Sequence, residues 1–383
     1  MWITEEISRL VNKLKRLEVF EAKGHLDHPE DLIFLNDMEG ASRALENIIA
    51  TAKNPKLITI KWDGYPALIF GRGTNGKFSI MDKHMFNKKD GTGRNIYSPE
   101  QFAQYDRARG VDRSELNNLI KNIWPDLDKE TSAGNGYYWG DLLFSQPLED
   151  NKGEYVFKAN PNGITYKVQT DSNIGKLLTN KKAGIAVHQY LAPDSVSTDQ
   201  AVSLNGSIGK LKNNAGIALI PSSMPIAPKI TVDAKLVNKV KSDIKKYGSN
   251  VEQLMTTAPQ AKAAFSSLFT TYINSKIVSG NLQNLVKDFY TYFQNRPMTG
   301  SMKKKLTDHL NNNKNGVLGA FSIWMSLYNL KMSIVNQLNN AAKDSPVQGY
   351  LSTGQQSQEG FVSQGLKFVD RMGFSRQNLA AKR

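Results

Sequence analysis

The spacing of apolar residues changes twice along the chain, and this limits the folds available to it. Residues from about 56 to 230 contain short β-rich runs, such as KLITIKWDG and GKFSIMDKHMF, separated by Gly/Asn turns. Residues 231–345 instead carry apolar residues at the 3.6-residue period of amphipathic helices. After a polar loop, EGFVSQGLKFVDR alternates again around a Gln-Gly turn, which predicts a β-hairpin.

An isolated hairpin is marginally stable in water, so we expect this one to return to the sheet of the first domain. The predicted fold class is therefore α+β, with a largely antiparallel sheet and a large all-helical insertion. The predicted boundaries are 1–230 for the N-terminal helices and the core, 231–350 for the helical insertion, and 351–383 for the hairpin that completes the core. Within the first part, residues 3–50 predict two helices around a turn.

Composition limits the chemistry and the partners. The 383 residues include no cysteine, which excludes disulfides, thiolate catalysis and cysteine-ligated zinc. No apolar run reaches the ~18 residues of a membrane span, so no membrane partner is expected. The amphipathic N-terminus carries acids and does not resemble a signal peptide, which favours a cytoplasmic location. A formal charge of +14 favours a polyanionic partner, above all nucleic acid, although lysine-rich helices can serve solubility alone.

Lys61 is the candidate nucleophile. It lies in IKWDGYPALIFGR, where a lysine, a carboxylate and a glycine interrupt a segment that otherwise predicts a buried strand. Competing chemistries lack their motifs: GRGTNGK does not end in Gly-Lys-Ser/Thr, and no Gly-x-Ser-x-Gly is present. His25 and His28 are three residues apart, but without a third ligand nearby they fit an exposed turn better than a metal site.

Four segments together resemble the covalent nucleotidyltransferase superfamily, which comprises ATP-dependent RNA and DNA ligases and mRNA capping enzymes. K61-W-D-G64 is similar to the Lys-x-Asp-Gly signature, and W139-G-D-L-L-F144 to motif III. E359-G-F-V362 resembles motif IV, and L366-K-F-V-D-R371 resembles the lysine-bearing motif V. Their order along the chain agrees with that of the family, and the resemblance implies an antiparallel nucleotidyltransferase core of the ATP-grasp-like ligase type.

The resemblance also implies a reaction. The amine of Lys61 would attack the α-phosphorus of ATP, expel pyrophosphate and form a lysyl–AMP adduct. A free lysine is protonated at neutral pH, so we expect its surroundings to favour the neutral amine. Lys367 is the second candidate catalytic residue, as the neighbouring cation that binds the α-phosphate.

The other site residues are carried over from the same motifs. Asp63 and Gly64 would close the turn that presents the nucleophile. Asp141 and Glu359 would hold Mg²⁺ or Mn²⁺, which prefer oxygen ligands. Asp141 is also a candidate ribose contact, and Arg371 a candidate nucleotide contact from motif V.

The base-binding residue is less defined by sequence. The family places an aromatic residue on the strand after motif III, where His188 and Tyr190 are the candidates, each with an inward-facing core position as the alternative. Tyr166 presents the same alternatives. Lys83 occupies the place where the family often has a basic residue beside the nucleotide.

Several departures refine the expected function. Pro66 stands where ligases commonly carry arginine, Asp141 stands where glutamate is usual, and only twelve residues follow Arg371, too few for an oligonucleotide-binding barrel. RNA ligases, including a bacteriophage branch, are therefore the nearer comparison, and an infected host cell would be the location if the gene is phage-encoded. We expect transfer of AMP to a 5′-phosphate end of RNA rather than DNA. The alternatives are GTP-dependent capping, nucleotidylation of a protein or tRNA, and a non-catalytic nucleic-acid-binding or virion protein. The sequence does not define the oligomeric state.

Overall fold

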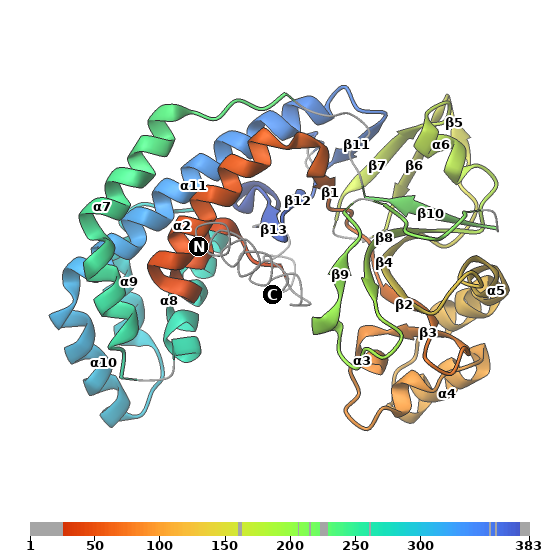
Figure 1. Cartoon of the computed structure of the whole chain (residues 1–383), viewed down its shortest axis with the longest axis horizontal. Coiled ribbons are helices and arrows are strands. Elements are labelled where there is room, and N and C mark those ends of the chain that lie inside the picture. The colour runs from red at the N-terminus through yellow and green to blue at the C-terminus, as the bar shows by residue number, and fades with distance from the viewer. Residues whose placement is uncertain are drawn as a thin grey trace, which may run out of the picture. The chain divides into compact units, whose positions relative to one another are not determined.

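The computed structural model describes most of the chain, in eight segments that cover 26–159, 163–205, 207–213, 216–222, 229–259, 262–351, 354–356 and 358–375. The first of the two predicted N-terminal helices, together with His25, lies outside the described residues. The fold is mixed, with helices and mainly antiparallel sheets, as the alternation of apolar residues predicts (Figure 1).

The chain divides into two compact units, each assembled from separate segments. The sheet unit comprises Met1–Leu26, Leu57–Ile226 and Ala342–Glu359. The helical unit comprises Asp27–Lys56, Ala227–Ala341 and Gly360–Arg383.

A six-stranded sheet forms the centre of the sheet unit. Its main order is β10-β8-β4-β2-β3, and β9 pairs with β8. All of its pairs are antiparallel except β10 with β8. The strands are β2 Ala67–Arg72, β3 Phe78–Asp82, β4 Gly136–Phe144, β8 Ala183–Leu191, β9 Val202–Ser203 and β10 Ile217–Pro221.

Helices pack against this sheet through apolar side chains. These helices are α3 Lys83–Phe86, α4 Pro99–Ala108 and α5 Ser114–Glu130, and α6 Asn173–Leu178 lies in the same unit. Phe102 of α4 and Ile120 of α5 join the buried cluster that contains Phe70 of β2 and Ile80 of β3. Ser98 and Pro99 begin α4, because the Ser98 hydroxyl accepts a hydrogen bond from the Gln101 backbone NH and proline needs no donor at the first helical position.

A second, four-stranded antiparallel sheet belongs to the same unit. Its order is β11-β7-β6-β5, and the strands are β5 Asp150–Asn151, β6 Glu154–Lys158, β7 Thr165–Gln169 and β11 Val347–Tyr350. The chain after the long helical segment therefore does return to the sheet unit, through β11 paired with β7.

The helical unit contains the predicted run of helices and one helix that was expected elsewhere. The run consists of α7 Ala234–Thr256, α8 Lys262–Ser279, α9 Leu285–Asn295, α10 Gly300–Asn312 and α11 Lys314–Ala342. The second N-terminal helix, α2 Leu32–Lys53, was expected in the first domain but groups with this unit. Its Phe34 stacks on Phe269 of α8 at 5.2 Å and also contacts Phe321 of α11, so an aromatic core holds it there.

The predicted C-terminal hairpin forms, and its residues group with the helical unit. β12 Phe361–Ser363 pairs with β13 Leu366–Phe368 around Gln364 and Gly365, both of which have positive φ. This is the backbone that a tight two-residue turn requires. The hydroxyl of Thr51 in α2 donates to the Ser363 hydroxyl at 2.9 Å, which ties the hairpin to α2.

Candidate active site

Lys61 directly follows the short strand β1 Thr59–Ile60 and begins a loop. The next two residues of this loop, Trp62 and Asp63, are held by contacts with the sheet unit. The Trp62 ring packs 4.8 Å from the ring of Tyr166. The Asp63 backbone NH donates to the Tyr166 hydroxyl at 2.6 Å, and the Asp63 carboxylate accepts from the Ile164 NH at 3.0 Å. Tyr166 is fully buried, so it supports the loop from within the core and is not presented to a ligand.

Gly64 is the point of closest approach between this loop and β4. A Cβ atom at Gly64 would lie 2.7 Å from both Asp141 Cβ and the Leu142 carbonyl oxygen, which explains why a glycine is needed. On either side of the contact, the Tyr65 NH donates to the Leu142 carbonyl at 2.9 Å and the Leu142 NH donates to the Pro66 carbonyl at 3.0 Å. Asp63 and Gly64 therefore fix the backbone that carries Lys61.

Glu359 contacts Lys61, although 298 residues separate the two in sequence. The Lys61 ammonium donates to Oε1 of the Glu359 carboxylate in a hydrogen-bonded ion pair. The pair is largely screened from solvent, since the Lys61 side chain is 30% exposed and that of Glu359 10% exposed. Oε2 of Glu359 is buried and has no hydrogen-bond partner within the part of the chain that the structure describes.

The electrostatics of this pair follow from burial and from a surplus of carboxylates. Burial raises the pKa of Glu359 to about 7, with Asp63 and Asp141 adding to the effect and Lys61 opposing it. Burial alone would lower the pKa of Lys61, but the Glu359 carboxylate outweighs it and the net pKa is raised. This differs from the sequence-based expectation of surroundings that favour the neutral amine, because the nearest charged group is an anion.

Asp141 is the first of several contacting residues on the six-stranded sheet. Its carboxylate lies 3.5 Å from Nε2 of His188, whose ring lies 5.6 Å from the ring of Trp139. The ammonium of Lys83 stands 5.5 Å from the centre of the same Trp139 ring. Three predicted site residues, Lys83, Asp141 and His188, are thus brought together around Trp139, which the sequence did not single out.

Tyr190 points to a different place. Trp139 pairs with Gln189 and Gly140 with Val187, so His188 is an extra residue in a β-bulge. Beyond the bulge, Tyr190 pairs with Tyr138; its ring contacts the Tyr138 ring at 5.5 Å and its hydroxyl donates to the Asn135 carbonyl at 2.9 Å. His188 is consequently the better placed of the two candidates for a base contact.

The two motif V residues belong to the helical unit. Lys367 lies on β13, opposite Val362, and its backbone NH donates to the Asp27 carbonyl at 2.9 Å. The Arg371 guanidinium is 3% exposed and pairs with Asp31 at 2.8 Å and with Glu30 at 3.3 Å. These ion pairs account for Arg371 as a structural residue, and the proposed site does not include it.

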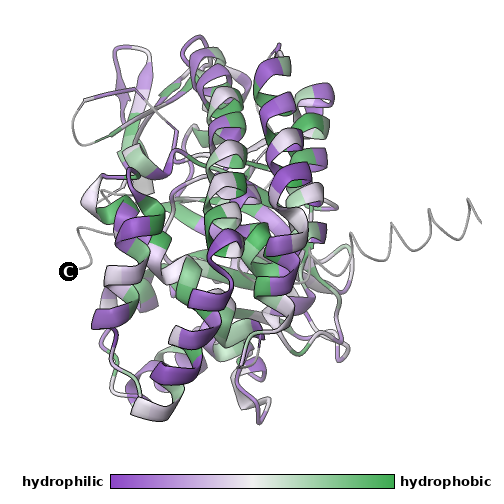
Figure 2. Cartoon of the chain, turned by 90° about the vertical axis from the view of Figure 1, so that its left-hand side faces the viewer, coloured by the Kyte–Doolittle hydropathy of each residue, from purple (hydrophilic) through white to green (hydrophobic). Residues whose placement is uncertain are grey.

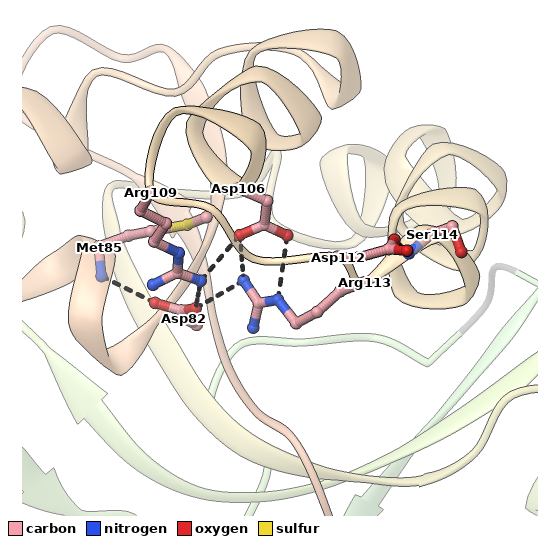
Figure 3. A network of polar contacts seen from close by, with 7 residues as sticks. All are labelled: Asp82, Met85, Asp106, Arg109, Asp112, Arg113 and Ser114. Carbon is pink, nitrogen blue, oxygen red and sulfur yellow. Dashed lines mark hydrogen bonds and ion pairs between the residues drawn. The ribbon is translucent and has the colours of Figure 1, made fainter.

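An ion network holds Asp82, the residue directly before Lys83 in the chain (Figure 3). The Asp82 carboxylate accepts from Arg109 and from Arg113, both at 2.8 Å, and from the Met85 NH at 2.8 Å. The fully buried Asp106 accepts from both arginines. Burial alone would raise the pKa of Asp82, but the Met85 NH and the two guanidinium groups outweigh it and lower the pKa.

This network positions Lys83. Asp82 is the N-cap of α3, and Lys83 is the first residue of that helix. The pattern D-x-x-R-x-x-x-R over Asp106, Arg109 and Arg113 is the sequence signal for the network, although nothing in it names Asp82 as the partner.

The oxygen donors beside Lys61 fit the divalent cation that the resemblance implies. Glu359 offers a buried oxygen without a partner among the described residues, and Asp141 supplies a second carboxylate that acts on the same pair. Hard oxygen donors of this kind suit Mg²⁺ or Mn²⁺. Within the described segments, no group of three or more His, Asp or Glu side chains could hold a metal ion, so further ligands would have to come from the substrate phosphates or water.

Comparison with known proteins places the chain in a family. Residues 23–383 match the model described as "Family of unknown function (DUF6267)". The chain belongs to this family. No curated protein and no solved structure matches the chain. None of the helices in the described segments is long and apolar enough to cross a membrane.

Proposed function

We propose that this DUF6267 protein is an ATP-dependent nucleotidyltransferase of the polynucleotide ligase type, with Lys61 as the nucleophile. The observation that carries the proposal is the contact between Lys61 and Glu359, which joins the Lys-x-Asp-Gly-like and motif IV-like segments in one unit. Asp141, from the motif III-like segment, acts electrostatically on the same pair. The product would be a lysyl–AMP adduct, whose AMP passes to a 5′-phosphate end, with RNA favoured over DNA by the resemblance.

The contact suggests how the amine becomes nucleophilic. The raised pKa of Lys61 keeps the resting side chain an ammonium, while the raised pKa of Glu359 makes that carboxylate a good proton acceptor near neutral pH. Transfer of one proton from Nζ to Glu359 leaves a neutral amine. The amine nitrogen then forms a bond to the α-phosphorus as the bond from that phosphorus to the pyrophosphate oxygen breaks, and pyrophosphate leaves with the bonding electrons. The nitrogen gives up its second proton to the departing pyrophosphate, which leaves the neutral phosphoramidate nitrogen.

The remaining residues supply binding and orientation. Asp141 and the second oxygen of Glu359, Oε2, would hold Mg²⁺ or Mn²⁺, while Oε1 of Glu359 accepts the proton from Lys61. The metal supplies Lewis-acid activation of the α-phosphate when bound. The half-buried ring of His188, which packs on the buried Trp139, offers a face against which a purine can pack. The Lys83 ammonium, over the Trp139 ring, is a candidate partner for the ribose or the phosphates.

Adduct formation tests the proposal directly. Purified protein incubated with Mg²⁺ and ATP labelled at the α-phosphate should acquire covalent label that is acid-labile and alkali-stable, as a phosphoramidate is. Lys61→Ala should abolish the label, whereas Lys158→Ala, on an exposed position of β6 in the same unit, should retain it. Label of equal intensity on the Lys61→Ala variant would remove Lys61 from its role.

The same assay separates the alternatives. Label from GTP in place of ATP would support capping, and transfer of the label to a protein or tRNA would support nucleotidylation of that acceptor. A protein that binds nucleic acid tightly but takes up no label from any of the four nucleotides would be a non-catalytic binding protein.

A further inference from the structure

The positive charge of the chain is concentrated in the helical unit. Residues 234–342, which span α7 to α11, contain 14 Lys and Arg against four Asp and Glu, a net charge of +10. The whole chain has 49 against 35, a net charge of +14, so the other 274 residues contribute only +4. A polyanion would therefore be attracted mainly to these helices.

Three lysines form a row along one side of α7. Lys235, Lys239 and Lys246 are separated by four and seven residues, which places them within about 40° of one another around the helix axis and spreads them over about 16 Å. All three are exposed. Figure 2 shows hydrophilic residues, in purple, along the helices of this unit. Lys241 and Lys245 are also exposed but lie about 80° or more away from the row.

A groove of about 520 Å³ runs beside this row, between α7, the start of α9 and α11. Lys239 and Lys287 line it from α7 and α9, and apolar side chains line it between them, among them Leu236, Leu285 and Met325. The volume is within the range of small-molecule pockets and suits a single nucleoside.

One carboxylate lines the groove, and one of its oxygens is paired, while the other, Oδ2 of Asp243, is buried without a hydrogen-bond partner among the described residues. Asp243 is buried, and its Oδ1 accepts from the Lys239 ammonium, whose side chain is 63% exposed. Lys287 forms no ion pair with any residue that the structure describes. Asn284, Ser322 and Asn329 add neutral hydrogen-bonding groups to the lining.

We propose that this groove and the lysine row beside it bind single-stranded nucleic acid. The lysines would follow the phosphates, and an unpaired base would enter the groove between Lys239 and Lys287. A duplex could offer only its phosphates, because its bases are stacked inside the helix. The inference rests on the proposed function only in its choice of partner, since the groove lies wholly in the helical unit and Lys61 in the sheet unit.

Two double variants of the full-length protein test the row. Lys235→Gln/Lys246→Gln removes two row charges, and Lys241→Gln/Lys245→Gln removes two charges from the same helix off the row. Fluorescence anisotropy over a salt series measures binding of a labelled single-stranded RNA of about 20 nucleotides. The affinity should weaken about tenfold for the row variant and about twofold or less for the control. The slope of log K against log salt should fall by about 1.4 for the row variant, because each neutralised phosphate of a single strand contributes about 0.7 to it.

A third variant tests the groove. Ser322→Trp would fill it without changing the charge, so single-strand binding should weaken while the salt slope stays the same. Thermal unfolding checks that this variant folds. If it does not fold, the two double lysine variants and the comparison of single-stranded with duplex RNA still test the proposal. Equal losses of affinity in the two lysine pairs, duplex RNA bound as tightly as single strands, or preferential binding of anionic phospholipid vesicles would each overturn the proposal. Adduct formation at Lys61 is measured without nucleic acid, so its failure is distinguishable from failure here.

Discussion

The ammonium of Lys61 donates to the carboxylate of Glu359, and this contact makes the proposed reaction dependent on pH. Only an ionised Glu359 can accept the proton of the ammonium. Because the pKa of Glu359 is raised to about 7, the rate of adduct formation should rise as the pH increases through that value. Initial rates of label incorporation from about pH 6 to about pH 10 measure this.

Glu359→Gln should remove the rise near pH 7 and lower the rate at pH 8 by about tenfold or more, since general-base contributions are typically of this size or larger. Glu154→Gln is the matched control, because Glu154 is a half-exposed carboxylate of the same unit whose nearest cation, Lys167, is 3.9 Å away. A Glu359→Gln enzyme with an unchanged pH profile would contradict the role of Glu359 as proton acceptor.

Asp141→Asn should raise the Mg²⁺ concentration needed for half-maximal adduct formation by about tenfold, because loss of a charged oxygen ligand weakens a hard-cation site. The asparagine keeps the size of the side chain, so the close packing of Gly64 against Asp141 Cβ is preserved. Titration with MgCl₂ at saturating ATP measures the shift. Asp171→Asn, in an exposed turn of the same unit, should leave the titration unchanged, and an equal shift in both variants would exclude a specific site at Asp141.

Local sequence patterns predicted the Lys61 loop and the helices because residues close together in the chain determine the conformation of both. The Lys-x-Asp-Gly sequence indicates a turn with a close backbone approach, and the structure has one at Gly64. The 3.6-residue period of residues 231–345 predicts helices regardless of what they pack against. The same period cannot say which partner a helix finds, so it did not indicate that α2 groups with the helical unit.

The rest of the site depends on relations that periodicity does not contain. A single extra residue, His188, in the bulge of β8 places Tyr190 beside Tyr138. The partners of Arg371 lie about 340 residues away in sequence, so the same residue could be interpreted as a nucleotide contact or as a buried ion pair. Trp139 is a core residue, as a tryptophan in an apolar strand ordinarily is, and the sequence could not show that Lys83 and His188 both lie against its ring.

Asp106→Asn should destabilise the sheet unit by about 2 kcal/mol, below the cost of breaking a fully buried ion pair because the two arginines retain some exposure. Asp106 is fully buried and bridges Arg109 and Arg113, which also hold Asp82 (Figure 3), the N-cap residue directly before Lys83. Asp112→Asn is the control: Asp112 is exposed and accepts one hydrogen bond, from the Ser114 NH, so it should cost about 0.5 kcal/mol. Urea unfolding measures the loss of stability in both variants. Equal losses would show that Asp106 contributes no more than an exposed carboxylate with one hydrogen bond.

Lys331 and Glu30 form an ion pair of 2.6 Å in which both side chains are fully buried, within the helical unit. Removing one partner leaves an uncompensated buried charge, so Lys331→Met and Glu30→Gln should each cost about 3 kcal/mol of unfolding free energy. The double variant should lie closer to the wild type than the sum of the two single effects, because the remaining charges, Asp31 and Arg371, still pair at 2.8 Å.

The pH dependence of stability gives an independent check on the same pair. Burial lowers the pKa of Lys331 below its ordinary value of 10.5, with Arg371 adding to the effect and Glu30 opposing it. Between the folded-state pKa and 10.5 the unfolded chain binds more protons at this lysine than the folded chain does, so its contribution makes stability rise with pH there. Lys331→Met should remove that rise in urea-unfolding free energies, and a variant with the same slope as the wild type would show that Lys331 is not protonated differently in the two states.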